Sequence, residues 1–330
     1  MLAAQYSEFS KDYSAIQVHT VEKPVPGPGQ VVVKVHSASI NPIDCKVHKG
    51  HASKVYGWPM DLPFKAGYDF AGVVDSTGED VDGFSQGERV YAVNWGQSGH
   101  YDAGEPGGGA FAEYILISAA KVSKIPQAVS FDQAAAVALA GTTAYQVLFD
   151  AAKVTPGQRI LIIGGSTSVG HLAIQLAKER GAWVATTAST RNAEFVSQFG
   201  ADLLINYNTE QWETLPELQG LDAVIDTVGE KDAFARATQT GVVKTDGAFV
   251  SIAGMEAGLD PAAHAPLHFA AFFLLSNSAS VQDELVSRLA SGALKVQIDE
   301  TFPFTTEGVQ GLFKKVASNS STGKNILRIM

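Results

Sequence analysis

The middle of the chain reads as a strand, a glycine-rich turn and a helix in immediate succession. Residues 160–163 form an uninterrupted run of isoleucine and leucine, which is typical of a strand buried on both faces of a parallel sheet. Gly164, Gly165 and Gly170 allow a sharp turn and close packing of the next helix, whose first N–H groups suit a pyrophosphate. Thr167 stands where the usual G-x-G-x-x-G pattern has glycine, so a plain connection between strand and helix is the alternative.

Length and composition indicate a two-domain globular protein. The chain has 330 residues, of which 45% are hydrophobic and 18% are charged. Its formal net charge of −10 argues against nucleic acid as the main partner, because phosphate binding needs a cationic surface. The longest apolar runs fall short of the roughly 20 residues that span a membrane. The single cysteine, Cys45, and the absence of a secretory leader predict a cytoplasmic protein without disulfides.

Two regions differ in their pattern. The first 122 residues are rich in expected strands and loops, whereas strands and helices alternate after residue 131, which is typical of βαβ units in a doubly wound sheet. We expect strands at residues 31–36, 70–75, 87–93, 109–117, 160–163, 183–188, 203–205, 223–226, 248–252 and 325–329. We expect helices at residues 132–148, 169–180, 192–199, 281–291 and 307–318, and an extended stretch at 294–304.

The end of the strand at 183–188 bears on the choice of cofactor. A dinucleotide fold that binds NAD usually has a carboxylate here, which accepts a hydrogen bond from the adenosine ribose. This chain instead has Ser189, Thr190 and Arg191, whose hydroxyls and guanidinium suit a 2′-phosphate. The sequence therefore favours NADP(H) over NAD, the alternative being that Arg191 is simply a solvated residue at a helix start.

Several segments, taken together, resemble the medium-chain dehydrogenase/reductase superfamily. They are residues 39–46, 66–74, 107–114, 138–145, the glycine turn and 322–327. Within that superfamily the chain resembles the zinc-independent quinone oxidoreductases related to zeta-crystallin, and it looks closest to the plant-type enone and alkenal reductases. The resemblance implies an α/β protein with two parts, a GroES-like β-rich catalytic domain at residues 1–125 and 280–330 and a Rossmann domain with a doubly wound parallel sheet at 126–279.

The resemblance also implies roles for individual residues. Asn41 and Lys46 would lie near the nicotinamide and its ribose, with Lys46 also supporting an anionic product unless it is a plain surface lysine. Tyr56 is a candidate proton donor in the loop expected over the substrate, and Tyr68 is another, although a packing role is the alternative for both.

The remaining candidates are cofactor-binding residues. The resemblance places Thr142 and Thr143 at a helix start near the nicotinamide-side phosphate, and Gly165, Ser166, Thr167, Ser168 and Val169 around the pyrophosphate. It places Ser189, Thr190, Arg191 and Tyr207 around the 2′-phosphate. It places Val228, Ile252, Phe272, Phe273, Leu274, Gly323 and Lys324 along the nicotinamide half.

The sequence argues against a metal site. Zinc-dependent relatives bind catalytic zinc through a cysteine, a histidine and an acidic residue, and the matching positions here are Asn41, Tyr68 and Asp69. Zinc needs thiolate, imidazole or carboxylate ligands, which asparagine and tyrosine do not supply. His264 and His268 have a spacing of four, but Pro266 lies between them. We therefore predict no metal.

These observations predict an NADPH-dependent reductase that transfers hydride, without metal, to a quinone or an α,β-unsaturated carbonyl compound. Such acceptors are already electrophilic, so orientation and stabilisation of the developing oxyanion suffice. A 2-enoyl thioester is a less favoured substrate, because no basic cluster for its phosphates is evident. The alternative is an NADPH-binding structural or regulatory protein with little turnover. By analogy with the group, we expect a homodimer joined near residues 269–276.

Overall fold

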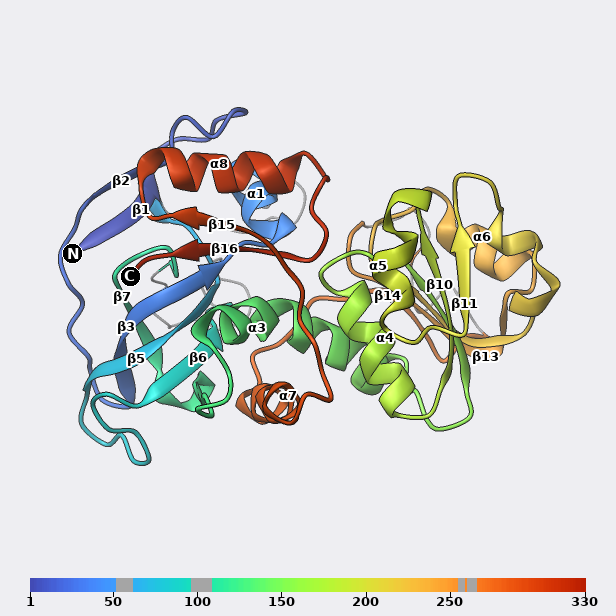
Figure 1. Cartoon of the computed structure of the whole chain (residues 1–330), viewed down its shortest axis with the longest axis horizontal. Coiled ribbons are helices and arrows are strands. Elements are labelled where there is room, and N and C mark those ends of the chain that lie inside the picture. Colours follow the sequence, from blue (N-terminus) through green and yellow to red (C-terminus); the bar gives the residue numbers. More distant parts are fainter. Residues whose placement is uncertain (52–61, 96–108, 255–258, 260–265) are drawn as a thin grey trace. The chain divides into compact units, whose positions relative to one another are not determined.

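A computed structural model describes residues 1–51, 62–95, 109–254, 259 and 266–330, which form two compact units (Figure 1). The first unit comprises residues 1–142 and 276–330, and the second comprises residues 143–275. The chain therefore leaves the first unit and later returns to it. Helix α3 (Phe131–Gln146), which we expected wholly in the second domain, crosses the boundary after Thr142.

The first unit is built on a seven-stranded sheet and a smaller three-stranded sheet. The order of the larger sheet is β15-β16-β3-β5-β6-β8, with β7 also paired to β3, and the order of the smaller is β2-β1-β4. The strands are β1 (Leu2–Tyr6), β2 (Gln17–Thr20), β3 (Gln30–Ser39), β4 (Phe64–Lys65), β5 (Asp69–Thr77), β6 (Arg89–Val93), β7 (Tyr114–Ser118), β8 (Ser123–Lys124), β15 (Ile298–Pro303) and β16 (Lys324–Arg328). These results confirm a β-rich first domain.

Strand β3 links the N-terminal and C-terminal segments of the chain that make up this unit. It pairs with β5 and β7, and it also pairs antiparallel with β16, with Ile326 opposite Ser39 (Figure 1). The valines along β3, such as Val33 and Val35, are fully buried and form part of the core. Residues that follow β3 are consequently fixed beside residues that begin β16.

Among the described residues of the first unit, three α-helices accompany these sheets besides α3. They are α1 (Pro42–His48), α7 (Ala279–Ser291) and α8 (Thr306–Ala317), and α1 contacts α8. Pro42 suits the first position of α1 because its fixed φ is helical and no N–H is needed there. The side chains of Ser278 and Thr305 cap α7 and α8 by accepting the N–H groups of Val281 and Gly308.

The second unit contains a six-stranded parallel sheet in the order β11-β10-β9-β12-β13-β14. Its strands are β9 (Arg159–Ile163), β10 (Trp183–Ala188), β11 (Leu203–Asn206), β12 (Leu221–Asp226), β13 (Val243–Ser251) and β14 (Phe269–Phe272). The helices are α4 (Gly170–Glu179), α5 (Ala193–Ser197) and α6 (Ala233–Gln239). The predicted doubly wound fold is confirmed. Strand β14 is an edge of the sheet, and the dimer expected there stays a prediction.

Some elements differ from the sequence-based expectation. The stretch 109–117 becomes a strand only at β7, because its first residues bond a different segment, and Gly109 passes too close to that segment for any side chain. A Cβ at Gly109 would lie 2.2 Å from the carbonyl oxygen of Lys65. The N–H groups of Ala110 and Phe111 instead bond the carbonyls of Gly67 and Ala66. Strands β1 and β2 and helices α1 and α6 were not anticipated.

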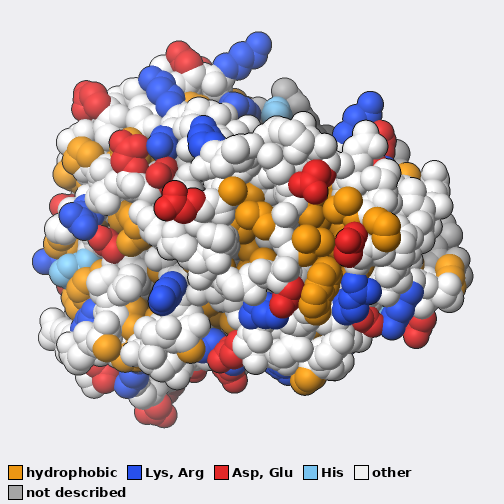
Figure 2. Space-filling model, turned by 45° about the vertical axis from the view of Figure 1, so that its right-hand side comes forward, with side chains coloured by type: hydrophobic (Ala, Val, Ile, Leu, Met, Phe, Trp, Pro, Cys, Tyr) orange, Lys and Arg blue, Asp and Glu red, His pale blue; other side chains and the backbone are white. Residues whose placement is uncertain are grey.

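The distribution of charge on the surface and the length and hydrophobicity of the helices agree with the amino-acid composition. Acidic and basic side chains are interspersed over the face drawn in Figure 2, in keeping with a mixed rather than uniformly basic surface. None of the helices in the described part of the chain is long and apolar enough to cross a bilayer.

Gln282 ties α7 to the large sheet of the first unit and is fully buried. Its side-chain oxygen accepts from the N–H of Val93 at 3.1 Å, and its amide nitrogen donates to the carbonyl of Lys121 at 2.9 Å. The hydroxyl of Tyr91 donates to the Gln282 carbonyl oxygen. The amide therefore satisfies two backbone groups that no water reaches.

We expect Gln282→Met to lower the free energy of unfolding by about 2–3 kcal/mol, because it leaves a buried N–H and a buried carbonyl without partners. Urea denaturation measures the effect. The matched control is Glu284→Gln on the same helix, which loses only an exposed pair with Arg288 and is expected to cost less than about 0.5 kcal/mol. Equal effects of the two changes would contradict this assignment.

Asp44 is a buried carboxyl group in α1. Its Oδ2 accepts from the N–H of Asn41 at 2.8 Å, whereas its Oδ1 has no hydrogen-bond partner among the described residues. The buried hydroxyls of Tyr6 and Tyr68 also lack such partners. Loss of solvation on burial, only partly offset by the Asn41 N–H, raises the pKa of Asp44 from 3.8 to about 7.

This raised pKa predicts a pH dependence of stability. Between pH 3.8 and about 7 the folded protein binds a proton that the unfolded chain releases, so Asp44 lowers the free energy of unfolding as pH rises through this window. We expect Asp44→Asn to remove that contribution, so that it loses less stability than the parent protein between pH 5 and pH 8 in urea denaturation. Exposed Asp82→Asn is the control and should behave as the parent does. Parallel pH profiles for Asp44→Asn and the parent would refute the assignment.

Candidate functional site

The glycine turn connects β9 to α4 in the second unit, and its three glycines meet different steric needs. Gly164 has a φ of +93°, a conformation that side chains rarely adopt. A Cβ at Gly165 would lie 2.4 Å from Thr186 Oγ1, and a Cβ at Gly170 would lie 2.1 Å from the Gly164 carbonyl oxygen. These contacts explain why glycine occupies all three positions.

Thr167, the departure from the usual glycine pattern, has a structural role of its own. Its hydroxyl oxygen accepts from the Gly170 N–H at 2.8 Å and lies 2.9 Å from Thr227 Oγ1. Thr167 thus helps to begin α4 and links the turn to the end of β12. Ser166 Oγ accepts from Asn192 at 3.0 Å, which links the turn to the residues after β10. Ser168 and Val169 immediately precede α4, at the helix end where the dipole favours an anion. The N–H groups of Gly170 and His171 are already bonded to Thr167.

The predicted 2′-phosphate residues come together at the ends of β10 and β11. These strands pair in parallel, with Ala188 opposite Asn206, so Ser189 and Tyr207 follow neighbouring strand ends. Asn206 Nδ2 donates to Thr190 Oγ1 at 2.8 Å. The Tyr207 side chain is 53% exposed.

Arg191 is exposed beside these residues, and no carboxylate pairs with it within the described ranges. A guanidinium without an acidic partner, next to several hydroxyls, is suited to a phosphate. The glycine turn, the start of α4 and this cation therefore fit NADP(H) chemically.

The other predicted cofactor residues of this unit follow β12, β13 and β14 at the same edge of the sheet. They are Val228, Ile252, Phe273 and Leu274, together with Phe272, which is the last residue of β14; the N–H of Phe273 bonds the Ser251 carbonyl at 2.7 Å. Asp226, which was not expected to have a role from the sequence, shapes this edge. Its Oδ1 accepts from the N–H groups of Val228 at 3.1 Å and Gly229 at 2.9 Å, and burial raises its pKa.

The expected placement of Thr142 and Thr143 at a helix start is wrong. Both lie in the second half of α3, and the Thr142 hydroxyl donates to the Ala138 carbonyl at 2.6 Å, one turn earlier. Both side chains are buried. The alanine-rich helix begins at Phe131, close to the start expected from its sequence pattern, so neither residue offers helix N-terminal N–H groups.

In the first unit, Asn41, Asp69 and Lys324 meet in a buried cluster. The Lys324 side chain is fully buried, and its Nζ donates to Ile40 O at 3.0 Å, Asn41 Oδ1 at 2.6 Å and Asp69 Oδ2 at 3.2 Å. An ammonium group has three N–H bonds, so these acceptors use all of them. Pairing of β16 with β3 brings residues from opposite ends of the chain to this point.

Asp69 is surrounded by donors. Its Oδ2 accepts from Ser39 Oγ at 2.7 Å and Asn41 Nδ2 at 2.8 Å in addition to Lys324, and its Oδ1 accepts from the Leu139 N–H at 3.0 Å. Several donors and a neighbouring cation make a buried carboxylate tolerable. In the sequence analysis Asp69 was named only because it matches the position of a zinc ligand in zinc-dependent relatives. Ser39 was not expected to be its hydrogen-bond partner.

Other predicted residues of this unit have varied environments. Lys46 is half-buried in α1, and burial lowers its pKa. Gly323 has a φ of +95°, and a Cβ there would lie 2.5 Å from the Gln297 carbonyl oxygen, so it is required for the entry into β16. Tyr68 packs against Trp95 with ring centroids 5.1 Å apart. Tyr56 lies outside the described residues.

The donor set in this cluster does not fit zinc. A Lys324 ammonium already lies 3.2 Å from Asp69 Oδ2, where a metal ion would be repelled, and Asn41 and Tyr68 are poor zinc ligands. Within the described ranges, no three His, Cys, Asp or Glu side chains are grouped so as to hold a metal ion.

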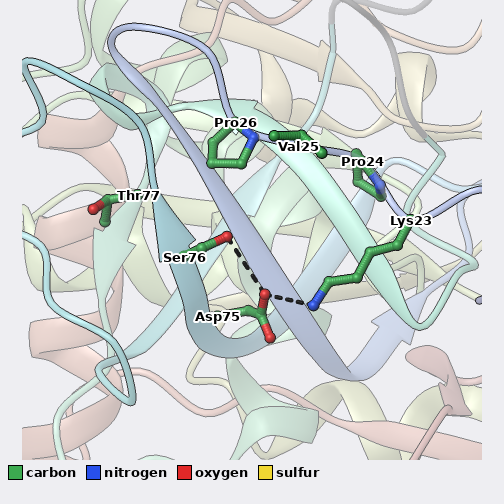
Figure 3. A pocket seen from close by; sticks show the side chains of 7 residues that line it. All are labelled: Lys23, Pro24, Val25, Pro26, Asp75, Ser76 and Thr77. Carbon is green, nitrogen blue, oxygen red and sulfur yellow. Dashed lines mark hydrogen bonds and ion pairs between the residues drawn. The ribbon is translucent and has the colours of Figure 1, made fainter.

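A separate surface groove of about 560 Å³ lies in the first unit between the segment 23–26 and β5 (Figure 3). Lys23 reaches across it to pair with Asp75 at 2.7 Å, and the same ammonium lies 4.0 Å from the centre of the Tyr114 ring. The two opposite charges are paired with each other, so this groove offers less to a charged ligand than the glycine turn and Arg191.

Comparison with known proteins agrees with both units. Residues 27–127 match the alcohol dehydrogenase GroES-like domain family, and residues 199–327 match the zinc-binding dehydrogenase family. The chain is 34% identical over 324 residues to the 2-methylene-furan-3-one reductase of Solanum lycopersicum, covering 96% of this chain and 77% of that protein. It is 33% identical over 322 residues to the chloroplastic NADPH-dependent alkenal/one oxidoreductase of Arabidopsis thaliana, with the same two coverages.

A solved structure extends the agreement to the fold. The match to the quinone oxidoreductase from Coxiella burnetii covers 100% of this chain and 99% of that chain, with a TM-score of 0.85 and 32% sequence identity. Sequence, fold and relatives concur, and the chain belongs to the medium-chain dehydrogenase/reductase superfamily, in its group of quinone oxidoreductases and alkenal/one reductases.

Proposed function

We propose that the protein is an NADPH-dependent reductase that transfers hydride to a quinone or an α,β-unsaturated carbonyl compound without a metal ion. The observation that carries the choice of cofactor is the exposed Arg191 guanidinium beside Ser189 and Thr190, at a strand end that lacks an acidic residue. The relatives named above, a furanone reductase, an alkenal/one oxidoreductase and a quinone oxidoreductase, support the substrate class.

In this proposal the second unit binds the cofactor. The glycine turn and the N-terminal end of α4 would hold its pyrophosphate, and Arg191, Ser189 and Thr190 would hold its 2′-phosphate. Asp226 keeps the loop at Val228 in shape through its bonds to backbone N–H groups. When bound, NADPH supplies the hydride.

The first unit supplies groups for the acceptor. Hydride addition to an enone moves the π electrons onto the carbonyl oxygen, and a nearby hydrogen-bond donor stabilises that charge. Asn41, an amide, and Lys46, a cation in a partly buried position, are our candidates for this role. A proton from solvent completes the reduction, so the proposal needs no dedicated acid.

The direct test follows nicotinamide absorbance while the protein is offered NADPH or NADH, with an ortho-quinone and a small vinyl ketone as parallel acceptors. We expect rapid oxidation of NADPH and much slower oxidation of NADH. NADPH binding without consumption by any of a broad panel of acceptors would instead favour a binding protein with little turnover.

The role of Arg191 can be measured separately. We expect Arg191→Met to weaken NADPH binding by about 10- to 100-fold, through loss of charge-assisted hydrogen bonds, and to leave NADH binding within twofold. Fluorescence titration gives both constants. Arg180→Met is the matched control, because Arg180 lies at the far end of α4 over Phe149. Equal weakening of NADPH and NADH would remove the 2′-phosphate assignment.

A further inference from the structure

The Asn41 side chain lies between two opposite buried charges. Its Oδ1 accepts from Lys324 Nζ at 2.6 Å, and its Nδ2 donates to Asp69 Oδ2 at 2.8 Å. Both charged side chains are fully buried, and Asn41 itself is 2% exposed. Solvent therefore does little to screen the two charges where they face the amide.

This arrangement allows only one orientation of the amide. An ammonium group only donates hydrogen bonds and a carboxylate only accepts them, so the oxygen must face Lys324 and the nitrogen must face Asp69. Turning the amide by 180° would set NH₂ against the ammonium and oxygen against the carboxylate. The backbone of Asn41 is held as well, because its N–H bonds Asp44 Oδ2 at 2.8 Å.

One hydrogen-bond donor is left over. The Asn41 amide nitrogen has two N–H bonds, and the one directed at Asp69 is the only one with an acceptor among the described residues. Its direction is set by the other, because the amide is planar. In contrast, Lys324 has used all three of its N–H bonds on protein acceptors and has none for a ligand.

We propose that Asp69 and Lys324 are positioning residues, which hold the Asn41 amide so that its second N–H is a fixed donor to the carbonyl oxygen of the acceptor. The inference rests on the proposed reductase function and deepens it.

The step itself is simple. Hydride forms a new C–H bond at the β-carbon of the enone, the π electron pair moves to the carbonyl oxygen, and NADPH is oxidised as the enone is reduced. The Asn41 N–H donates to the resulting enolate oxygen, and solvent then protonates the α-carbon. A preorganised donor of this kind acts on the developing charge and so on the rate of hydride transfer more than on NADPH binding.

The test is a double-mutant cycle measured by single-turnover hydride transfer from NADPH to a vinyl ketone. Removing Lys324 alone would leave a buried carboxylate unpaired and endanger folding, so the pair is replaced together by Asp69→Asn with Lys324→Met. This neutral pair also lets the Asn41 amide turn. Both the pair and Asn41→Ala are made alone and combined.

We expect Asn41→Ala to slow hydride transfer by about 10- to 100-fold and the neutral pair to slow it by a similar factor. In the Asn41→Ala background, the neutral pair should change the rate by less than about twofold, because its effect passes through Asn41. The dissociation constant for NADPH should stay within about twofold throughout. Gln282→Met, which lowers stability elsewhere in the same unit, is the control and should leave the rate unchanged.

Two results would overturn the inference in distinguishable ways. If the neutral pair slows hydride transfer equally with and without Asn41, the pair does not act through Asn41, although the reductase function stands. If Asn41→Ala transfers hydride at the parent rate, the amide is not the donor. Failure of the parent protein to reduce any acceptor would instead remove the proposed function, and the inference with it.

Discussion

The buried pair of Asp69 and Lys324 is the interaction on which the organisation of the first unit depends. A lysine ammonium without exposed surface is stable only where acceptors and an opposite charge replace water, and here Ile40, Asn41 and Asp69 do so. Those partners lie at the end of β3 and the start of β5, whereas Lys324 begins β16. The pair therefore requires the register in which β16 runs beside β3, and it specifies that register by charge as well as by packing.

The second unit obeys a different constraint, which is set by backbone geometry. All six strands run parallel, so their carboxyl ends share one edge, and ligands of such sheets bind there. The glycine turn lies at this edge because it follows the carboxyl end of β9, and any side chain at Gly165 or Gly170 would collide with neighbouring atoms. Arg191 follows β10 and Asp226 ends β12 at the same edge; the guanidinium is exposed, whereas the carboxylate is buried and bonds the N–H groups of the next loop.

Much of the second unit could be predicted from the sequence, because its strands are apolar runs separated by glycine turns. The first unit was harder. Its site depends on contacts between residues far apart in the chain, such as Asn41 with Lys324, and no local pattern encodes them. The resemblance gave Lys324 only as a residue near the cofactor, and it placed Thr142 at a helix start, although the helix expected at residues 132–148 already contained Thr142 in its interior. Thr167 departs from the usual glycine pattern, and only the structure shows that its hydroxyl accepts the Gly170 N–H at the start of α4.

The return of the chain to the first unit has a consequence for how the protein is made. During synthesis β3 emerges early, but its neighbour β16 emerges only after the whole second unit has left the ribosome. Until then Asp69 has no Lys324 to offset its charge, and the end of β3 at Ser37–Ser39 has no β16 beside it. The second unit is continuous in sequence, so all of its strands are available before the C-terminal segment of the first unit is synthesised. We therefore expect a nascent chain in which the second unit is already folded while the large sheet of the first unit still lacks β16 and the buried Lys324 that begins it.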